Sequence, residues 1–445
     1  MKYAVFFVAL LGMPALAFML TVYRRWMKWV FYGMVAALCV YIPTSINFFS
    51  HEHYRGSARG MEVSVIHLLA VAVLMALAFR KKSPGFLPGT GAKLYFIYFL
   101  LCLPSWMTAA NRLYSWFETW KMIMLHLVYL AIYGYLRSSG DVKGVLKALA
   151  AFTCFNFALV VKGHFQGIYQ PHGVFPHQNG LAMAMHAAGG LFFAGYLMHG
   201  LRHRFGRFCA AACVCAAGAT VWTYSRMAIA LMPINYGLVA LFCAIGGRLG
   251  TWTKRIAPLA ILGLAAFAVV LPRIVERFQN APEASKNTRI ELARCAREMI
   301  VDEPWRGIGI NNWGVKINPP YEYAERAERE TNRGEDFKDG IVETVYLLVG
   351  AECGLPALAA MVVWFGYYLF IAFRLMKRLA GTWYFFIPAG LAGGLTVIYG
   401  HSCFEWTLRM QQNLIFQLFF FAILEYLNTS WKELRAEEMA ARRAA

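Results

Sequence analysis

Apolar runs of about 20 residues recur along almost the whole chain, and short polar stretches separate them. The hydrocarbon core of a bilayer is about 30 Å thick, so a helix needs about 20 apolar residues to cross it. The pattern therefore predicts an all-α polytopic membrane protein with about 12–13 transmembrane helices. The predicted spans are 3–22, 26–43, 61–79, 94–110, 113–136, 145–161, 180–200, 208–224, 227–246, 256–272, 346–373, 383–402 and 411–428.

One long polar stretch interrupts this pattern between the tenth and eleventh predicted spans. We therefore expect transmembrane helices 1–10 in 1–272, a loop with short helices in 273–342, helices 11–13 in 343–428 and a basic tail in 429–445.

The long loop has a helical pattern of its own in 287–301, where apolar residues recur on one stripe. Asn287 or Thr288 is expected to cap this helix, with Glu291 completing a capping box. The following stretch, 321–339, is highly charged and is expected to be exposed. The predicted apolar stripe consists of Ile290, Ala293, Ala296, Met299 and Ile300.

Charge indicates the orientation of the chain. The formal net charge is +19, yet 273–342 is almost neutral, with 12 basic and 13 acidic residues. Of the 31 basic residues elsewhere, 23 fall on one side of the predicted membrane, which should be cytoplasmic by the positive-inside rule. The N-terminus and 273–342 are then on the outer side and the C-terminus is cytoplasmic. Because topology accounts for the charge, we expect no nucleic-acid binding.

The first apolar run has a second interpretation. Lys2, the apolar run and Ala15-Leu16-Ala17 resemble a secretory signal peptide. Arg24 and Arg25 directly after the run favour a retained helix with its N-terminus outside.

Composition excludes several classes of protein. Hydrophobic residues make up 59% of the chain, charged residues 15%, and the mean hydropathy is +0.47. These values exclude an ordinary water-soluble enzyme, a disordered protein and a coiled coil. Nearly all of the ten cysteines lie in apolar runs, and the spacing of His164, His172 and His177 matches no metal-ligand pattern. We therefore expect neither a disulfide framework, nor a metal, nor a cofactor.

Ionisable residues near membrane depth are costly and often functional. By the predicted topology, those near the helix ends gather on the outer side, which indicates chemistry on an external or lipid-borne substrate. They are Arg59, Glu62, Arg112, Glu118, Lys121, Arg226, Glu343, Glu352, Glu405 and Arg409.

Two arginines are candidates for binding a phosphate, since a guanidinium binds phosphate oxygens bidentately. Arg226 lies between two spans joined by almost no loop, and Arg289 lies at the predicted start of the loop helix, where the helix dipole also favours an anion. The alternatives are a side chain snorkelling to the interface for Arg226 and a solvated charge for Arg289.

Glu343 opens the eleventh predicted span. A partly desolvated carboxylate there suits a general base that deprotonates a hydroxyl, whereas the alternative is a carboxylate that only complements the helix dipole. Glu352, two to three turns deeper, is better explained by a structural hydrogen bond to a neighbouring helix.

The loop 162–179 is rich in Gly, Pro, His and amide side chains. His177, Gln178 and Asn179 are candidates for the polar floor of a sugar or diphosphate pocket. The alternative is a re-entrant loop shaped by Gly and Pro, in which Gln178 and Asn179 satisfy the backbone.

Several segments together resemble the O-antigen ligase / O-antigen polymerase superfamily of bacterial inner-membrane glycosyltransferases. The resemblance covers about 173–375 well and the first spans only by topology. The matching stretches are 173–179 (GVFPHQN), 224–226 (YSR), 288–290 (TRI), 299–300 (MI), 304–313 (PWRGIGINNW), 343–347 (ETVYL) and 351–355 (AECGL).

This resemblance implies transfer of a glycan from undecaprenyl diphosphate to an acceptor hydroxyl in the periplasm, without a metal and with inversion. It implies that Arg226 and Arg289 hold the diphosphate. Ligases of the family carry a His-Asn pair where this chain has Glu343-Thr344, so we expect a polymerase of O-antigen or exopolysaccharide repeat units with Glu343 as the base. We expect the substrate-binding residues to be His177, Gln178, Asn179, Arg59, Arg112 and Tyr346.

Two other functions remain as alternatives. One is a ligase that transfers glycan to lipid A–core, and the other, more distant, is a transporter or flippase of lipid-linked glycans. Beyond the lipid-linked donor and the bilayer, the expected partners are other polysaccharide-assembly proteins, namely a flippase and a chain-length regulator.

Overall fold

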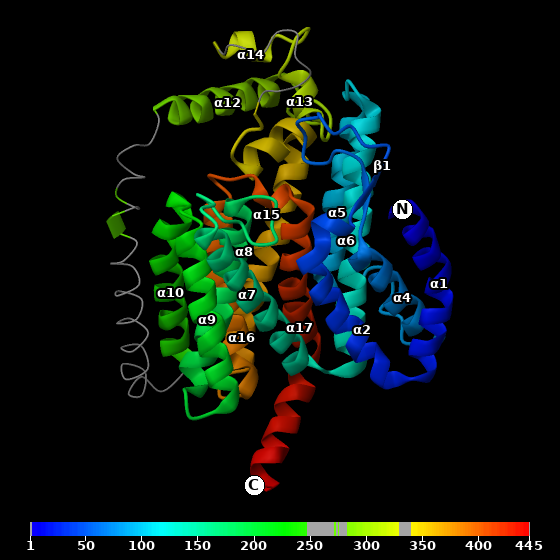
Figure 1. Ribbon diagram of the computed structural model, residues 1–445, viewed down its shortest axis with the longest axis vertical. Coiled ribbons are helices and arrows are strands. Elements are labelled where there is room, and N and C mark those ends of the chain that lie inside the picture. Colours follow the sequence, from blue (N-terminus) through cyan, green and yellow to red (C-terminus); the bar gives the residue numbers. More distant parts are fainter. Residues whose placement is uncertain (1, 247–270, 273–274, 276–282, 329–339, 445) are drawn as a thin grey trace. The chain divides into compact units, whose positions relative to one another are not determined.

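The protein is an all-α polytopic membrane protein, as the apolar runs predicted. The structure is a computed structural model that describes residues 2–246, 271–272, 275, 283–328 and 340–444 (Figure 1). In this part of the chain, eight helices are long and apolar enough to cross a membrane, and two shorter apolar helices cover Phe6–Val22 and Val65–Phe79.

The predicted spans largely coincide with helices where the structure describes them, although 61–79 begins in a short strand, Met61–Val63. Twelve of the thirteen contain a helix, and the other, 256–272, lies almost wholly outside the described residues, as does 329–339 of the charged stretch. Within the described part, fewer helices meet the length and hydropathy of a full span than we predicted. The reason is that α5 has only 14 residues and α6 carries polar side chains along its first half.

The chain forms two compact units, and the first comprises Met1–Tyr135, Ala281–Gly366 and Ser402–Leu418. Three of its helices, α6, α15 and α17, continue into the second unit. Its elements are α1 (Lys2–Val22), α2 (Arg24–Ala37), η1 (Leu38–Val40), α3 (Tyr41–Thr44), β1 (Ile46–Phe48), β2 (Met61–Val63), α4 (Val65–Phe79), α5 (Gly89–Cys102), η2 (Leu103–Met107), α6 (Arg112–Ser139), α12 (Glu283–Asp302), α13 (Trp313–Lys316), α14 (Tyr323–Arg326), α15 (Val345–Arg378), η5 (Thr407–Arg409) and α17 (Gln411–Ala444).

A short antiparallel hairpin in unit 1 frames the polar segment 49–60. Its strands β1 and β2 pair in the register Ile46↔Val63, Asn47↔Glu62 and Phe48↔Met61. The segment 49–60 is thereby closed into a loop, and this loop contacts the site described below.

The loop helix α12 differs from its prediction in two ways. It begins at Glu283, so Asn287 and Thr288 lie inside the helix and the predicted capping box is wrong. Ala296 and Met299 of the predicted stripe are buried, but Ile290 is exposed, and Leu292 and Cys295 complete the buried face. This face packs with α13, α14 and the first turns of α15 in one hydrophobic cluster, which holds α12 to the unit (Figure 1).

A close backbone contact joins 304–313 to α15, where the helix breaks at Gly354. The amide nitrogens of Ile308 and Gly309 donate to the carbonyl oxygens of Ala351 and Glu352, at 2.9 and 3.1 Å. Gly354 has φ +81°, and a Cβ there would lie 2.5 Å from the carbonyl oxygen of Trp305. Only glycine allows this approach, so two of the segments that carried the family resemblance pack directly on each other.

The second unit comprises Leu136–Asn280, Tyr367–His401 and Phe419–Ala445. Its helix α8 is buried along most of its length and packs on α9, α10 and α16. Small residues permit this packing, since a Cβ on Gly190 would lie 2.8 Å from the carbonyl oxygen of Gly390. The elements that lie wholly in this unit are α7 (Val142–Phe165), α8 (Gln178–His199), α9 (Arg204–Trp222), α10 (Arg226–Gly246), η4 (Trp383–Phe385) and α16 (Phe386–His401).

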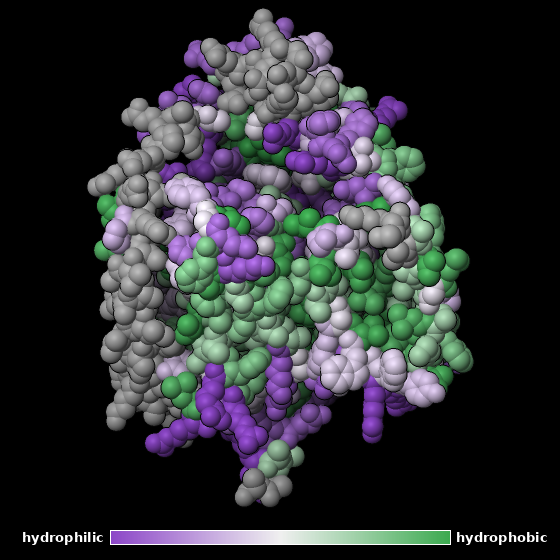
Figure 2. Space-filling view, in the orientation of Figure 1, coloured by the Kyte–Doolittle hydropathy of each residue, from purple (hydrophilic) through white to green (hydrophobic). Residues whose placement is uncertain are grey.

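Surface hydropathy agrees with a membrane protein. On the face shown in Figure 2, hydrophobic residues cover the sides of the helices and hydrophilic residues gather toward their ends. The direction in which the helices cross the membrane stays a prediction from the positive-inside pattern.

Candidate active site

One arginine and two carboxyl groups meet in unit 1, on segments far apart in the sequence. Arg289 extends from α12, and its Nε contacts Oε2 of Glu343. Its Nη2 lies 3.9 Å from Oε1 of Glu405. We call Arg289, Glu343 and Glu405 the acidic triad.

Backbone contacts hold the two carboxyl-bearing segments together. Glu343 lies two residues before α15, where the hydroxyl of Thr344 and the amide of Val345 donate to the carbonyl oxygen of Ser402, at 3.3 and 3.2 Å. Glu405 follows Ser402 by three residues, so these contacts fix its segment beside the start of α15.

Hydrophobic packing also holds α12, which carries Arg289, against the segments that carry Glu343 and Glu405. Leu292, one turn after Arg289 on α12, belongs to the same hydrophobic cluster as Val342 and Trp406. Val342 and Trp406 are the direct chain neighbours of Glu343 and Glu405. The same apolar contacts therefore position all three polar side chains.

The members of the triad differ in exposure. The side chains of Arg289 and Glu343 are 42% and 35% exposed, whereas that of Glu405 is 8% exposed. Burial raises the pKa of the Glu405 carboxyl to about 8; the neighbouring Glu343 also raises it, and Arg289 opposes the shift. Glu405 is therefore mostly protonated at neutral pH. It lies beside the ion pair of Arg289 and Glu343, which water can reach.

The environment of Arg289 corrects one prediction. Arg289 does not lie at a helix start, because α12 begins six residues earlier, so the helix dipole gives it no added affinity for an anion. It is not a solvated, unpaired charge either, since it contacts Glu343.

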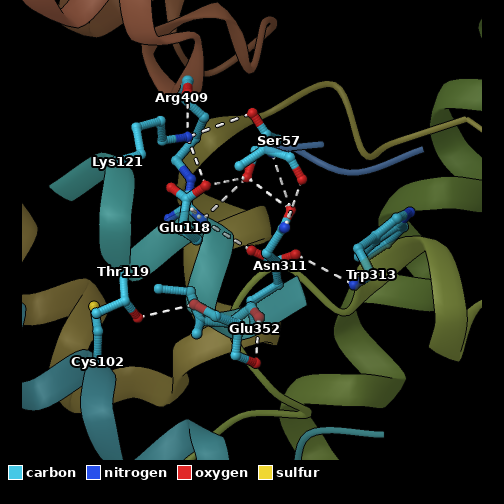
Figure 3. A network of polar contacts seen from close by, with 12 residues as sticks. Ser57, Cys102, Glu118, Thr119, Lys121, Asn311, Trp313, Glu352 and Arg409 are labelled. Atoms are coloured by element: carbon cyan, nitrogen blue, oxygen red, sulfur yellow. Dashed lines mark hydrogen bonds and ion pairs between the residues drawn. The ribbon is translucent and has the colours of Figure 1, made fainter. Parts of the chain in front are cut away.

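A second polar cluster, the buried charge network, lies deeper in unit 1 (Figure 3). Nη2 of Arg409 lies 3.1 Å from Oε1 of Glu118 and 3.0 Å from Oε2 of Glu352. Nζ of Lys121 lies 2.6 Å from Oε2 of Glu118 and donates to the carbonyl oxygen of Arg409 at 2.7 Å. Two cations thus balance two carboxylates, and all four side chains are buried.

This network also anchors the loop after α12. Oε1 of Glu352 accepts a hydrogen bond from the amide of Trp313 at 3.2 Å. Glu352 therefore makes the structural contact that the sequence predicted for it. Because the four charges are buried and paired, they support the site and do not face a substrate.

Asn311 is a structural residue that the sequence did not single out. Its side-chain amide donates to the carbonyl oxygens of Ala58 and Tyr114, at 2.8 and 2.9 Å, and its Oδ1 accepts from the Ser57 hydroxyl at 3.2 Å. It thereby fastens the loop after α12 to segment 49–60 and to α6. The one feature of the sequence that could have identified Asn311 was its position in the stretch 304–313, which carried part of the family resemblance.

The other candidates in unit 1 do not join the triad. Arg59, in segment 49–60, and Arg112, at the first residue of α6, are exposed, and neither has an ion-pair partner among the described residues. Tyr346 is half-buried in the first turn of α15. Their role in binding a substrate stays a prediction.

The remaining candidates belong to unit 2. His177 caps α8, with its Nδ1 accepting from the amide of Asn179 at 3.3 Å, and Nε2 of Gln178 donates to Oε1 of Gln170 at 3.2 Å. Burial lowers the pKa of His177, and His172 lowers it further, so its imidazole is neutral at pH 7. The His177 contact satisfies a backbone amide, whereas Gln178 contacts another side chain, and the role of these residues in a substrate pocket stays a prediction.

Arg226 is the first residue of α10 and is half-buried. Within the described part of the chain it has no ion-pair partner, and its role in binding a diphosphate stays a prediction. No group of three His, Cys, Asp or Glu side chains among the described residues is arranged to hold a metal ion.

Comparison with known proteins gives one match. Residues 211–362 match the family model of O-antigen ligase (Wzy_C), and no curated protein matches the chain. The matched region contains Arg226, Arg289 and Glu343, whereas Glu405 lies beyond it. About a third of the chain is thus similar to the O-antigen ligase family, in a protein with several helices that could span a membrane.

Proposed function

We propose that this protein transfers a glycan from an undecaprenyl-diphosphate-linked donor to an acceptor hydroxyl at the periplasmic face of the bacterial inner membrane. The product would be a polymer of O-antigen or exopolysaccharide repeat units. The observation that carries the proposal is the contact between Arg289 and Glu343 at the start of α15, inside the region that matches the O-antigen ligase family.

In this proposal Glu343 is the general base. The acceptor oxygen attacks the anomeric carbon of the donor as its proton passes to the Glu343 carboxylate. The bond from that carbon to the diphosphate breaks, and the diphosphate leaves with the electron pair. A single in-line displacement of this kind inverts the configuration at the anomeric carbon and requires no metal.

The two arginines have separate parts in the proposal. Arg289 holds the Glu343 carboxylate in place and stays partly exposed, so it can also meet the charge that develops on the diphosphate. Arg226 offers a second guanidinium to the donor. The surplus of basic residues in the loops on the other side of the predicted membrane supports a periplasmic position for both Arg226 and Arg289.

The choice between polymerase and ligase rests on Glu343-Thr344, where family ligases carry His-Asn. We expect a deletion strain to bear single repeat units on its lipid acceptor, as seen by gel and mass analysis of the glycans. Complete lipid-linked chains that never reach the acceptor would instead identify a ligase. Wild-type glycans in the deletion strain would contradict both functions.

Replacing Arg226 with lysine should lower transfer about 10–100-fold, because lysine keeps the charge but loses the bidentate fork. Transfer is measured with purified protein and a lipid-diphosphate-linked donor. Arg207→Lys, at an exposed arginine of the neighbouring helix α9, is the matched control. Equal transfer by wild type and Arg226→Lys would remove Arg226 from the donor site.

A further inference from the structure

Glu405 is the member of the acidic triad that neither the family match nor the predicted mechanism assigns a role. It lies on the segment between α16 and α17, outside the matched residues 211–362. Its carboxyl is nearly buried and approaches the same guanidinium that holds Glu343.

We propose that Glu405 is a positioning residue for the transfer reaction, which acts on the base Glu343 by competing with it for Arg289. This inference rests on the proposed function, because it takes Glu343 to be the base. Glu405 acts through the proton it carries and does not itself contact the acceptor.

The geometry gives Glu405 two states. When its carboxyl is protonated, Arg289 is left with Glu343 as its one anionic neighbour in the triad and stays on the Glu343 carboxylate, whose Oε2 is then occupied. When the carboxyl loses its proton, Arg289 faces two anions and is drawn toward Glu405, whose Oε1 is already 3.9 Å from Nη2. Oε2 of Glu343 is then no longer covered by the guanidinium and can take the proton of the acceptor hydroxyl.

Burial and the charge of Glu343 favour the protonated state of Glu405 at neutral pH, whereas the charge of Arg289 opposes it. From α12 it is faced by Arg289 and from the start of α15 by Glu343, while Arg409, on its own segment, is directed into the buried charge network. The raised pKa of about 8 means that the carboxyl changes from about one-tenth to about nine-tenths ionised between pH 7 and pH 9.

The first test is the pH profile of transfer by the full-length protein with a lipid-diphosphate-linked donor. We expect the wild-type rate to rise about tenfold between pH 7 and pH 9, following ionisation of Glu405. Glu405→Gln should lose this rise and fall below the wild-type rate at both pH values, because the amide cannot ionise and leaves Arg289 on Glu343. Glu405→Asp should restore a rise, and Asp302→Asn, at an exposed pair on the far end of α12, should keep the wild-type profile.

A second measurement does not depend on activity. The infrared C=O band of a protonated carboxyl should disappear between pH 7 and pH 9 in wild type and be missing at both pH values in Glu405→Gln. Loss of the band with an unchanged pH profile in Glu405→Gln would overturn the inference and leave the proposed function standing. Wild-type protein that shows the band but no transfer at any pH would overturn the proposed function, and the inference with it.

Discussion

Glu343→Gln is expected to lower glycan transfer about 10²–10⁴-fold while leaving donor binding intact. Glutamine has nearly the same shape, yet its amide cannot take the proton of the acceptor hydroxyl. Transfer should be measured with purified protein and a lipid-diphosphate-linked donor, and donor binding should be measured separately. A fall in rate without a fall in binding places the loss in the chemical step.

The fold should tolerate this change. The ion pair with Arg289 is about one-third to two-fifths exposed, and such pairs contribute at most about 1 kcal/mol to the free energy of unfolding. Complementing the helix dipole would be worth no more than about 1 kcal/mol as well. Unchanged turnover with slightly lowered stability would therefore mean that Glu343 only complements the dipole, and that the base lies elsewhere.

Unit 1 offers a matched control for this variant. Asp302 and Arg326 form an ion pair on α12 and α14 with side-chain exposures of 36% and 39%, close to those of the Glu343–Arg289 pair. Asp302→Asn removes a carboxylate of similar exposure from the same unit but away from the triad. It should leave turnover at the wild-type level, so equal losses in both variants would indicate a general effect of lost surface charge.

Hydropathy was sufficient to predict the class of fold. Membrane-spanning helices need long apolar runs, and those runs can be read from the residues one segment at a time. The start and the buried face of α12 were harder to predict from the sequence. Its capping residues were inferred from a local pattern, whereas its buried face is determined by contacts with α13 to α15. The described helix already includes Glu283, ahead of the predicted caps Asn287 and Thr288.

The site was predicted in parts but not as an arrangement. The sequence identified Arg289 and Glu343 as separate candidates and gave Glu405 only a place among the outer ionisable residues. Nothing in the spacing of three segments so far apart in the chain indicates that they meet. Their meeting depends on the contacts of Ser402 with the start of α15 and on the hydrophobic cluster beneath α12.

The same limit explains the buried charge network. One-sided charge suggested that Glu118, Lys121 and Arg409 faced an external substrate, as a set with Glu343. Helical spacing relates Glu118 to Lys121, but it cannot show that Arg409 crosses to both carboxylates. The charged residues that the sequence pattern places near the site therefore form two groups in the folded chain. Some are accessible to solvent, and the others are buried and stabilise the structure around the site.

Arg409→Met should be the most destabilising single change in unit 1, by about 3–5 kcal/mol in the free energy of unfolding. The variant leaves Glu118 and Glu352 buried with only Lys121 to balance them, and methionine fills the volume without supplying a donor. Thermal unfolding of the purified protein in one detergent would measure the loss. Adding Glu352→Gln to Arg409→Met makes the network neutral again, so the double variant should be more stable than Arg409→Met alone, a coupling that a double-mutant cycle isolates. If the two losses simply add, Arg409 and Glu352 do not depend on each other for stability, and the network is not what fixes the loop after α12 and the segment bearing Glu405.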